Sequence, residues 1–299
     1  MKKQHKSLLI LLLTAMIWGF AFVAQLIGAN SVGSFTFNAA RFTLGGLSLV
    51  PVVLIFERRK TEKSRLRTTI LSGMAAGIVL FAASTLQQLG VMYTGSAGKA
   101  GFLTGIYTVI VPIIGIFLKH RTNINNWIGA GIGAAGLFFL CVTSDFTVAT
   151  GDILLLAGSL GWAAQIFIID YFAPKVNAAK LISVQFFVAG LLSLTVALIT
   201  ETNTLEAVIS SIPSLLYTGI MSSGIAYTLQ TVGQKYAKPA TASVILSTES
   251  LFGALAGFVF LNEVMRGREL LGCGLMMTAV IIAQLPARKK LMAHAEALK

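Results

Sequence analysis

Two nine-residue stretches, TLQQLGVMY at 85–93 and TLQTVGQKY at 228–236, decide the fold of this chain. They share Thr, Leu, Gln, Gly and Tyr at matching positions without a gap, at an offset of 143 residues. Shared hydrophobicity alone does not produce polar and aromatic identities of this kind, so the match indicates an internal repeat. Further matches at offsets of 143 and 144 spread over both halves: Gly129 with Gly272, Gly131 with Gly274, Trp18 with Trp162, Phe42 with Phe186 and Gly46 with Gly190.

The composition excludes an ordinary soluble fold for the repeated unit. Hydrophobic residues make up 56% of the 299 residues and charged residues 11%, against roughly 25% charged in a soluble globular protein. The mean hydropathy is +0.82. A chain with so little polar surface cannot cover a water-soluble particle of this mass, so a bilayer must be its solvent.

Ten mostly apolar segments are long enough to cross a bilayer, which takes about 20 residues. Their expected bounds are 8–28, 35–55, 69–92, 97–118, 127–143, 151–171, 181–200, 213–233, 240–261 and 270–285. Each half contains five, an odd number, so the second copy must be inserted upside down relative to the first. The sequence predicts an all-α polytopic membrane protein of ten transmembrane helices in two inverted five-helix repeats, 1–143 and 144–299, the second with a basic cytoplasmic tail.

The formal net charge of +12 reports insertion direction rather than a nucleic-acid partner. If the N-terminus is cytoplasmic, 19 of the 23 lysines and arginines fall in the tails and loops on that side. Lys99, Arg266 and Arg268 remain outside, and Arg41 lies within a span. This asymmetry is typical of the positive-inside rule, and anionic headgroups attract such loops. We expect a multi-pass protein of the cell membrane with both termini cytoplasmic.

Several short motifs carry a resemblance that covers nearly the whole chain. They are Trp18-Gly19-Phe20 in the first span, Arg41-Phe42 in the second, Ala97-Gly98-Lys99-Ala100 leading to Pro112 in the fourth, and Leu261-Asn262-Glu263 after the ninth. At these residues the sequence resembles the drug/metabolite transporter superfamily, specifically its ten-helix EamA-like branch.

The resemblance implies a proton-linked or gradient-driven exporter or exchanger of small metabolites, with amino acids a common substrate class. The chain departs from the family pattern at two places. It has Glu249-Ser250 where the family often has Glu-Pro, and Lys119-His120 and Asn262-Glu263 where the family has a Gly-Glu pair.

Three charged residues in or near the spans are candidate site residues, because a charge inside a bilayer usually faces a cavity or a partner. Glu249 lies about nine residues into the ninth span, ~14 Å deep, and is a proton-coupling or ammonium-binding candidate. Arg41, ~9 Å from the outer face, is a candidate carboxylate ligand or outer-gate residue. Either side chain can instead be a structural anchor. Lys99, near the outer end of the fourth span, is a weaker candidate because a terminal lysine often only reaches the interface.

Neutral polar and aromatic side chains form a second group of candidates. Amides within spans must face the bundle interior or a neighbouring helix: Gln25, Asn38, Gln87, Gln88, Gln165, Gln185 and Gln230. Four aromatic residues lie far from the interfaces where Trp and Tyr usually anchor: Trp18, Trp162, Tyr107 and Tyr227. Interhelical bonding and simple packing are the alternatives to lining a substrate path.

No pattern in the sequence supports enzymatic chemistry, a metal or a cofactor. His5, His120 and His294 are scattered and do not pair with cysteines or carboxylates at metal-ligand spacing. The favoured function is a secondary transporter that moves a small zwitterion by alternating access, with protons as a possible coupling ion and a homodimer as a possible assembly. A passive facilitator or channel, and a structural or lipid-handling membrane protein, are the alternatives.

Overall fold

A computed structural model describes most of the chain as helices. The described residues are 2–29, 31–56, 63–94, 97–120, 122–141, 149–260 and 265–285, and no strand occurs within these ranges. The first half contains α1 (Lys2–Ala29), α2 (Ser34–Phe56), α3 (Lys63–Thr94), α4 (Ala97–Gly105), α5 (Tyr107–Phe117) and α6 (Ile124–Cys141). The second half contains α7 (Thr150–Phe172), α8 (Ala178–Thr200), α9 (Leu205–Ser210), α10 (Ile212–Leu216), the π-helix η1 (Tyr217–Ala226), α11 (Tyr227–Gln234), α12 (Pro239–Leu246), α13 (Glu249–Phe260) and α14 (Gly267–Gln284).

Seven helical segments of the described chain are long and apolar enough to cross a bilayer. They are Gln4–Gly28, Ser34–Leu54, Leu66–Thr94, Ala100–Phe117, Thr150–Phe172, Ala178–Thr200 and Pro239–Phe260. The apolar helix Ile124–Leu140 is shorter. The chain is therefore an all-α, multi-pass membrane protein.

Three segments that the sequence predicts as continuous helices are interrupted. Between α4 and α5 the interruption falls at Ile106, directly after Gly105, a residue that weakens helix interiors. Between α12 and α13 it falls at Ser247 and Thr248, whose hydroxyls donate to the carbonyls of Val244 and Ile245. Such local bonds compete with the helical ladder and loosen it. The third segment, 213–233, contains the ten-residue π-helix η1.

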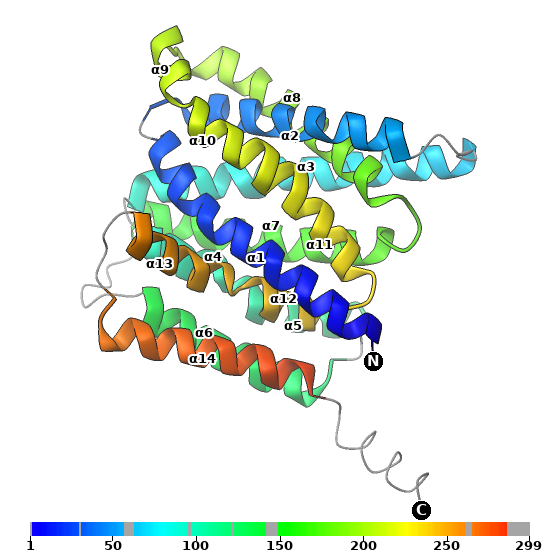
Figure 1. Ribbon diagram of the computed structural model, residues 1–299, viewed down its shortest axis with the longest axis vertical. Coiled ribbons are helices and arrows are strands. Elements are labelled where there is room, and N and C mark those ends of the chain that lie inside the picture. The colour runs from blue at the N-terminus through cyan, green and yellow to red at the C-terminus, as the bar shows by residue number, and fades with distance from the viewer. Residues whose placement is uncertain are drawn as a thin grey trace, which may run out of the picture.

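Helices from the two halves pack against each other throughout the bundle (Figure 1). The principal pairs are α2 with α8, α3 with α7 and α8, α1 with α13, α2 with η1, and α6 with α14. Glycines permit the closest approach: a Cβ on Gly272 of α14 would lie 2.6 Å from the backbone nitrogen of Leu140 in α6. Helices that lack this small residue could not come so near.

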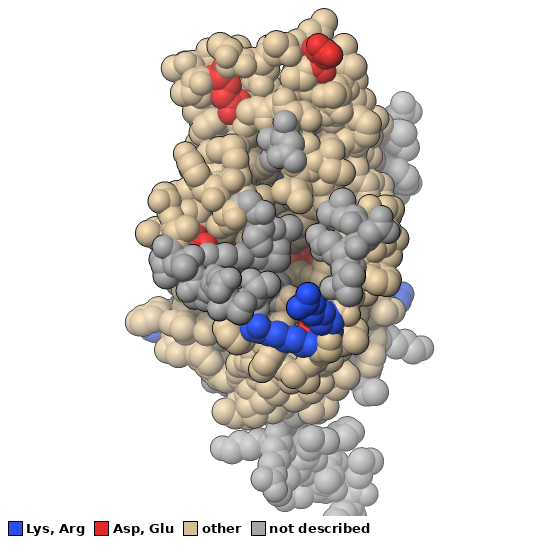
Figure 2. Space-filling view, turned by 90° about the vertical axis from the view of Figure 1, so that its left-hand side faces the viewer, with Lys and Arg blue, Asp and Glu red and all other residues tan. Residues whose placement is uncertain are grey.

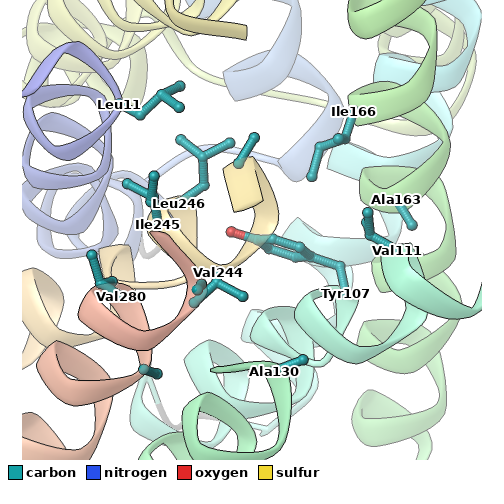
Figure 3. Close-up of a cluster of buried hydrophobic side chains, with 13 residues drawn as sticks. Leu11, Tyr107, Val111, Ala130, Ala163, Ile166, Val244, Ile245, Leu246 and Val280 are labelled. Atoms are coloured by element: carbon teal, nitrogen blue, oxygen red, sulfur yellow. The ribbon is translucent and has the colours of Figure 1, made fainter. Parts of the chain in front are cut away.

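The described ends of the chain lie together at one end of the bundle, at the right of Figure 1. Figure 2 views the opposite end, where the described acidic side chains are scattered and two basic side chains lie next to each other in the lower half of the view. A buried apolar cluster that includes Leu11, Val111, Ile166 and Leu246 joins α1, α5, α7 and α12 (Figure 3). This cluster lies next to the cavity described below.

Candidate functional site

A cavity in the middle of the bundle encloses about 620 Å³, part of it open to solvent. Residues of both halves line it, from α1, α2, α3, α5, α7, η1, α11, α12 and α13. It brings together ten of the residues that the sequence singles out: Trp18, Gln25, Arg41, Gln87, Tyr107, Trp162, Gln165, Tyr227, Gln230 and Glu249. Spacing along the chain cannot bring these side chains together, so the packing of the two halves creates the site.

Arg41 supplies the positive charge of the cavity. Its side chain extends from α2 and is 5% exposed. One guanidinium nitrogen, Nη1, donates to Gln25 Oε1 at 2.8 Å, and the guanidinium carbon lies 4.6 Å from the ring centre of Phe42. The Nε atom is buried without a hydrogen-bond partner. Among the described residues no carboxylate pairs with Arg41, so a buried cation faces the cavity with donors to offer.

Glu249 supplies the negative charge. It is the first residue of α13 and is 8% exposed. The Tyr107 hydroxyl donates to its Oε1 at 3.2 Å. A helix N-terminus favours a carboxylate because its unpaired N–H groups and dipole are positive. Within the described part of the chain no lysine, arginine or histidine pairs with it, so Glu249 can take a proton or an ammonium group.

Aromatic rings line the cavity together with the two charges. Tyr227 packs edge-on against Trp18, with ring centres 4.8 Å apart, and against Phe186 at 5.2 Å. Phe186 stacks on Phe42 at 5.6 Å, which ties this set of rings to Arg41. The Trp18 indole donates to the carbonyl of Ser222 in η1 at 3.2 Å. These contacts hold the rings in fixed positions, where their faces can hold an apolar or cationic group.

Several buried polar atoms around the cavity have no hydrogen-bond partner in the structure. They include Gln230 Oε1, Gln165 Oε1 and Trp162 Nε1. A buried polar atom left unpaired costs about 1–3 kcal/mol. Water or a bound polar molecule in the cavity would satisfy these groups, so the wall is suited to a ligand with several polar atoms.

Four candidates lie elsewhere. Gln88 is buried in α3 with both amide atoms unpaired, and it does not line the cavity. Asn38 is fully buried in α2 with both amide atoms unpaired, but it does not line the cavity. Gln185 stands behind the wall, where its Oε1 accepts from Gln165 Nε2 at 3.2 Å. Lys99 belongs to α4, and its side chain lies outside the described part of the structure.

Serines of the π-helix are the site residues that sequence reasoning missed. Ser222 and Ser223 both line the cavity from η1. Serine is common in helices of every kind, so nothing in the sequence distinguishes these two from the others. Gln25 and Gln165, which line the cavity, could be predicted from the sequence, because an amide within a span must face the bundle interior or a neighbouring helix.

The sequence that builds this cavity matches a known family of membrane proteins. The sequence profile of the EamA-like transporter family matches residues 5–142 and again residues 149–284. The chain is a member of the EamA-like transporter family. This membership, within the drug/metabolite transporter superfamily, makes the chain a membrane transporter.

Relatives of this EamA-like transporter are also named as transporters. An uncharacterized transporter of Archaeoglobus fulgidus is 32% identical, covering 92% of this chain and 84% of its own length. The uncharacterized transporter YoaV of Bacillus subtilis is 22% identical, over 91% and 96%. One solved crystal structure of a protein superposes with a TM-score of 0.79 at 19% identity, over 95% of this chain and 98% of that one. This match shows that the two proteins share a fold. The named relatives are transporters, which favours transport over catalysis.

Proposed function

We propose that this EamA-like transporter is a secondary transporter of the cell membrane that exports or exchanges a small zwitterion, such as an amino acid, by alternating access. The observation that carries the proposal is the pair of buried opposite charges in one cavity. Arg41 and Glu249 both line it, and neither has an ionic partner among the described residues. A buried charge without a partner is costly, so the pair is best explained by a substrate that brings a carboxylate and an ammonium group.

We also propose ten spans in two inverted repeats. If each interrupted helix is counted as one span, α4 with α5, α10 to α11 through η1, and α12 with α13, the described helices make ten without the short helix α9. Corresponding helices of the two halves make the same contacts. Helix α3 contacts α7, and their counterparts in the other half, η1 with α11 and α1, also contact each other. Helix α1 contacts α13, and their counterparts, α7 and α4 with α5, also contact each other. The tandem match to the family profile also supports the repeat. Central sites between inverted repeats are frequent in secondary transporters.

The proposed orientation places both termini in the cytoplasm. The described ends lie at the same end of the bundle (Figure 1), as an even number of spans requires. The excess of lysine and arginine in the tails and loops of that side supports a cytoplasmic position. The cavity would then be filled from one side at a time as the two halves rearrange.

A thermal-shift screen of the purified protein tests the substrate class. A ligand that binds only the folded state raises the free energy of unfolding by RT ln(1 + [L]/Kd), about 2.7 kcal/mol at 100 times Kd, and therefore raises the melting temperature. The panel should contain the protein amino acids, their amines and their carboxylic acids as separate compounds. We expect a shift with one or more amino acids and a smaller shift with the matching amine or acid. Shifts with none of the zwitterions would contradict the proposal.

Reconstituted vesicles test the role of Glu249 in coupling. The variant Glu249→Gln keeps the size and the hydrogen bond from Tyr107 but cannot exchange a proton at neutral pH. We expect it to abolish uptake that is driven by a pH gradient, while exchange of the same amino acid between two equal pools continues. Unchanged driven uptake would remove Glu249 from coupling, whereas a passive facilitator would show no uptake driven by the pH gradient even in the unmodified protein.

A further inference from the structure

A second cavity lies at the end of the bundle that holds the N-terminus. It encloses about 580 Å³, part of it open to solvent, and its wall includes Val111 and Gly115 of α5, Phe167 of α7 and Ala240 of α12. The Ser7 hydroxyl of α1 donates to the carbonyl of Gly233 at 2.6 Å. That bond places the start of α1 beside the turn that leads into α12, and so beside this cavity.

One buried apolar layer separates the second cavity from the central one. Val111 lines the second cavity and belongs to the same cluster as Tyr107, Ile166 and Leu246, which line the central one. Figure 3 shows Tyr107, Val111 and Ile166 on the side of α5 and α7, and Leu246 of α12 on the facing side of the same cluster. Val111 has no measurable exposure, and the exposed fractions of Ile166 and Leu246 are 3% and 1%. A hydrated charge cannot cross such a layer while it is closed.

Neighbouring residues of α7 face the two sides of this layer. Ile166 lines the central cavity, and Phe167, the next residue, lines the second one. Along α1, Leu11 belongs to the layer, whereas Trp18 and Gln25 line the central cavity nearer the other end of the helix. The order along the molecule is therefore second cavity, apolar layer, central cavity.

Two basic side chains line the second cavity, and a carboxylate lies near one of them. His120 and Lys238 belong to its wall, and the His120 ring lies 5.5 Å from that of Phe167. Asp170, one turn further along α7, interacts electrostatically with His120. Two basic side chains and an aromatic face, with a carboxylate near one of them, suit the same zwitterion that the central cavity would hold.

We propose that the second cavity is the inner vestibule of the transport path, and that Val111, Ile166 and Leu246 form the inner gate. This inference rests on the proposed function and adds a second binding site and a barrier to it. The vestibule receives the zwitterion on the cytoplasmic side, and the gate then separates it from Arg41 and Glu249.

The interrupted helices give the gate a means of opening. Helix α5 begins just after the break at Ile106, and α12 ends just before the break at Ser247 and Thr248. These two half-helices pack against each other and carry Val111 and Leu246. They can move together without bending α4 and α13, because each break lies on the central-cavity side of the gate residue.

A single substitution fills the vestibule without disturbing its wall. A Cβ added at Gly115 would meet only ordinary contacts, the nearest being Thr122 Oγ1 at 3.5 Å, so a larger side chain extends into the cavity. Gly131 in α6 provides the matched control, because it is exposed and has no atom within 4 Å of an added Cβ. The variants are Gly115→Leu and Gly131→Leu.

Uptake and binding are measured with an equimolar mixture of the twenty radiolabelled protein amino acids. In inside-out vesicles we expect Gly115→Leu to reduce uptake at least tenfold while the mixture still raises its melting temperature. Gly131→Leu should match the unmodified protein in both measurements. Uptake by Gly115→Leu at the level of the control would overturn the assignment of the second cavity as the inner vestibule. If the unmodified protein showed neither uptake nor a thermal shift, this result would instead count against the proposed function.

Thiol labelling tests the vestibule even without a transported substrate. In a chain with Cys141 and Cys273 replaced by alanine, Gly115→Cys should react with a membrane-impermeant maleimide in inside-out vesicles and not in right-side-out vesicles. Ser223→Cys, in the central cavity, should show the opposite preference because the gate is closed. Labelling of Gly115→Cys only from the outer side, or from neither side, would overturn the proposal.

Discussion

At the scale of single residues, Arg41 gives the sharpest expectation. Its guanidinium is oriented by Gln25 and by the ring of Phe42, and a planar fork holds a carboxylate through two bonds. Hydrogen bonds to charged groups are worth about 1.5–3 kcal/mol. We therefore expect Arg41→Gln to weaken amino-acid binding about tenfold to 100-fold, and Arg41→Lys to recover only part of the loss.

Isothermal titration of the purified variants measures this effect. Arg268→Gln is the control, since Arg268 lies over the rings of Phe138 and Phe139 in the α6–α14 pair, outside the cavity. Equal affinities for Arg41→Gln and Arg268→Gln would show that Arg41 anchors the helix rather than the substrate.

The residue scale also shows what the sequence can reveal of the site. Arg41 and Glu249 were found because a charge is rare within an apolar span and needs a reason. Ser222 and Ser223 were not found, because a hydroxyl within a helix can satisfy itself on a carbonyl of the preceding turn. Gln185 shows the alternative that the sequence left open: its amide marked the bundle interior, and its Oε1 accepts from Gln165 Nε2 of the neighbouring helix, behind the cavity wall.

At the scale of elements, α2 begins with a cap that another helix supplies. Asn177 caps α8 with its own side chain, whereas the residue 144 positions earlier is Gly33, which has none. Glu201, at the end of α8, accepts instead from the backbone N–H groups of Phe35 and Thr36 at 2.9 and 2.8 Å. The second half of the chain therefore secures the start of the helix that carries Arg41.

Removal of this cap should lower the stability of the folded protein. We expect Glu201→Ala to cost up to about 2 kcal/mol, the upper range for a lost N-cap, and to lower the melting temperature. Glu206→Ala is the control at the same end of the molecule, because Glu206 is exposed and its side chain accepts no bond from α2. Identical melting temperatures for the two variants would contradict the assigned cap.

The interrupted helices show the limit of reading elements from hydropathy. The segments 97–118, 213–233 and 240–261 are mostly apolar, which predicts length but not continuity. Their breaks depend on local competition for hydrogen bonds, as at Ser247 and Thr248, and on packing that only the folded bundle supplies. Tyr107 and Glu249 each begin the half-helix that follows a break. The two breaks, which hydropathy does not predict, therefore place the two residues that form the only side-chain hydrogen bond described for Glu249.

At the scale of the whole molecule, the contact between α6 and α14 joins the two halves through small residues. A side chain at Gly272 would collide with the backbone of Leu140, whereas Gly274, two residues later on the same helix, has no atom within 4 Å of an added Cβ. We expect Gly272→Val to destabilise the protein by about 1–3 kcal/mol, the usual range for overpacking. Gly274→Val should leave the melting temperature unchanged in the same detergent, and equal losses for both would exclude a close contact at Gly272.

The insertion direction of the whole chain depends on charge near the first spans. Six cations lie in 57–67, between the second and third predicted spans, and the positive-inside rule retains such a loop in the cytoplasm. We expect replacement of all six by glutamine to produce a mixed topology. A green fluorescent protein fused after Lys299 should then lose fluorescence, and an alkaline phosphatase fused there should gain activity. Replacement of Arg266 and Arg268, which lie on the predicted outer side, should leave both signals unchanged; the same result for the six-cation variant would contradict the assigned orientation.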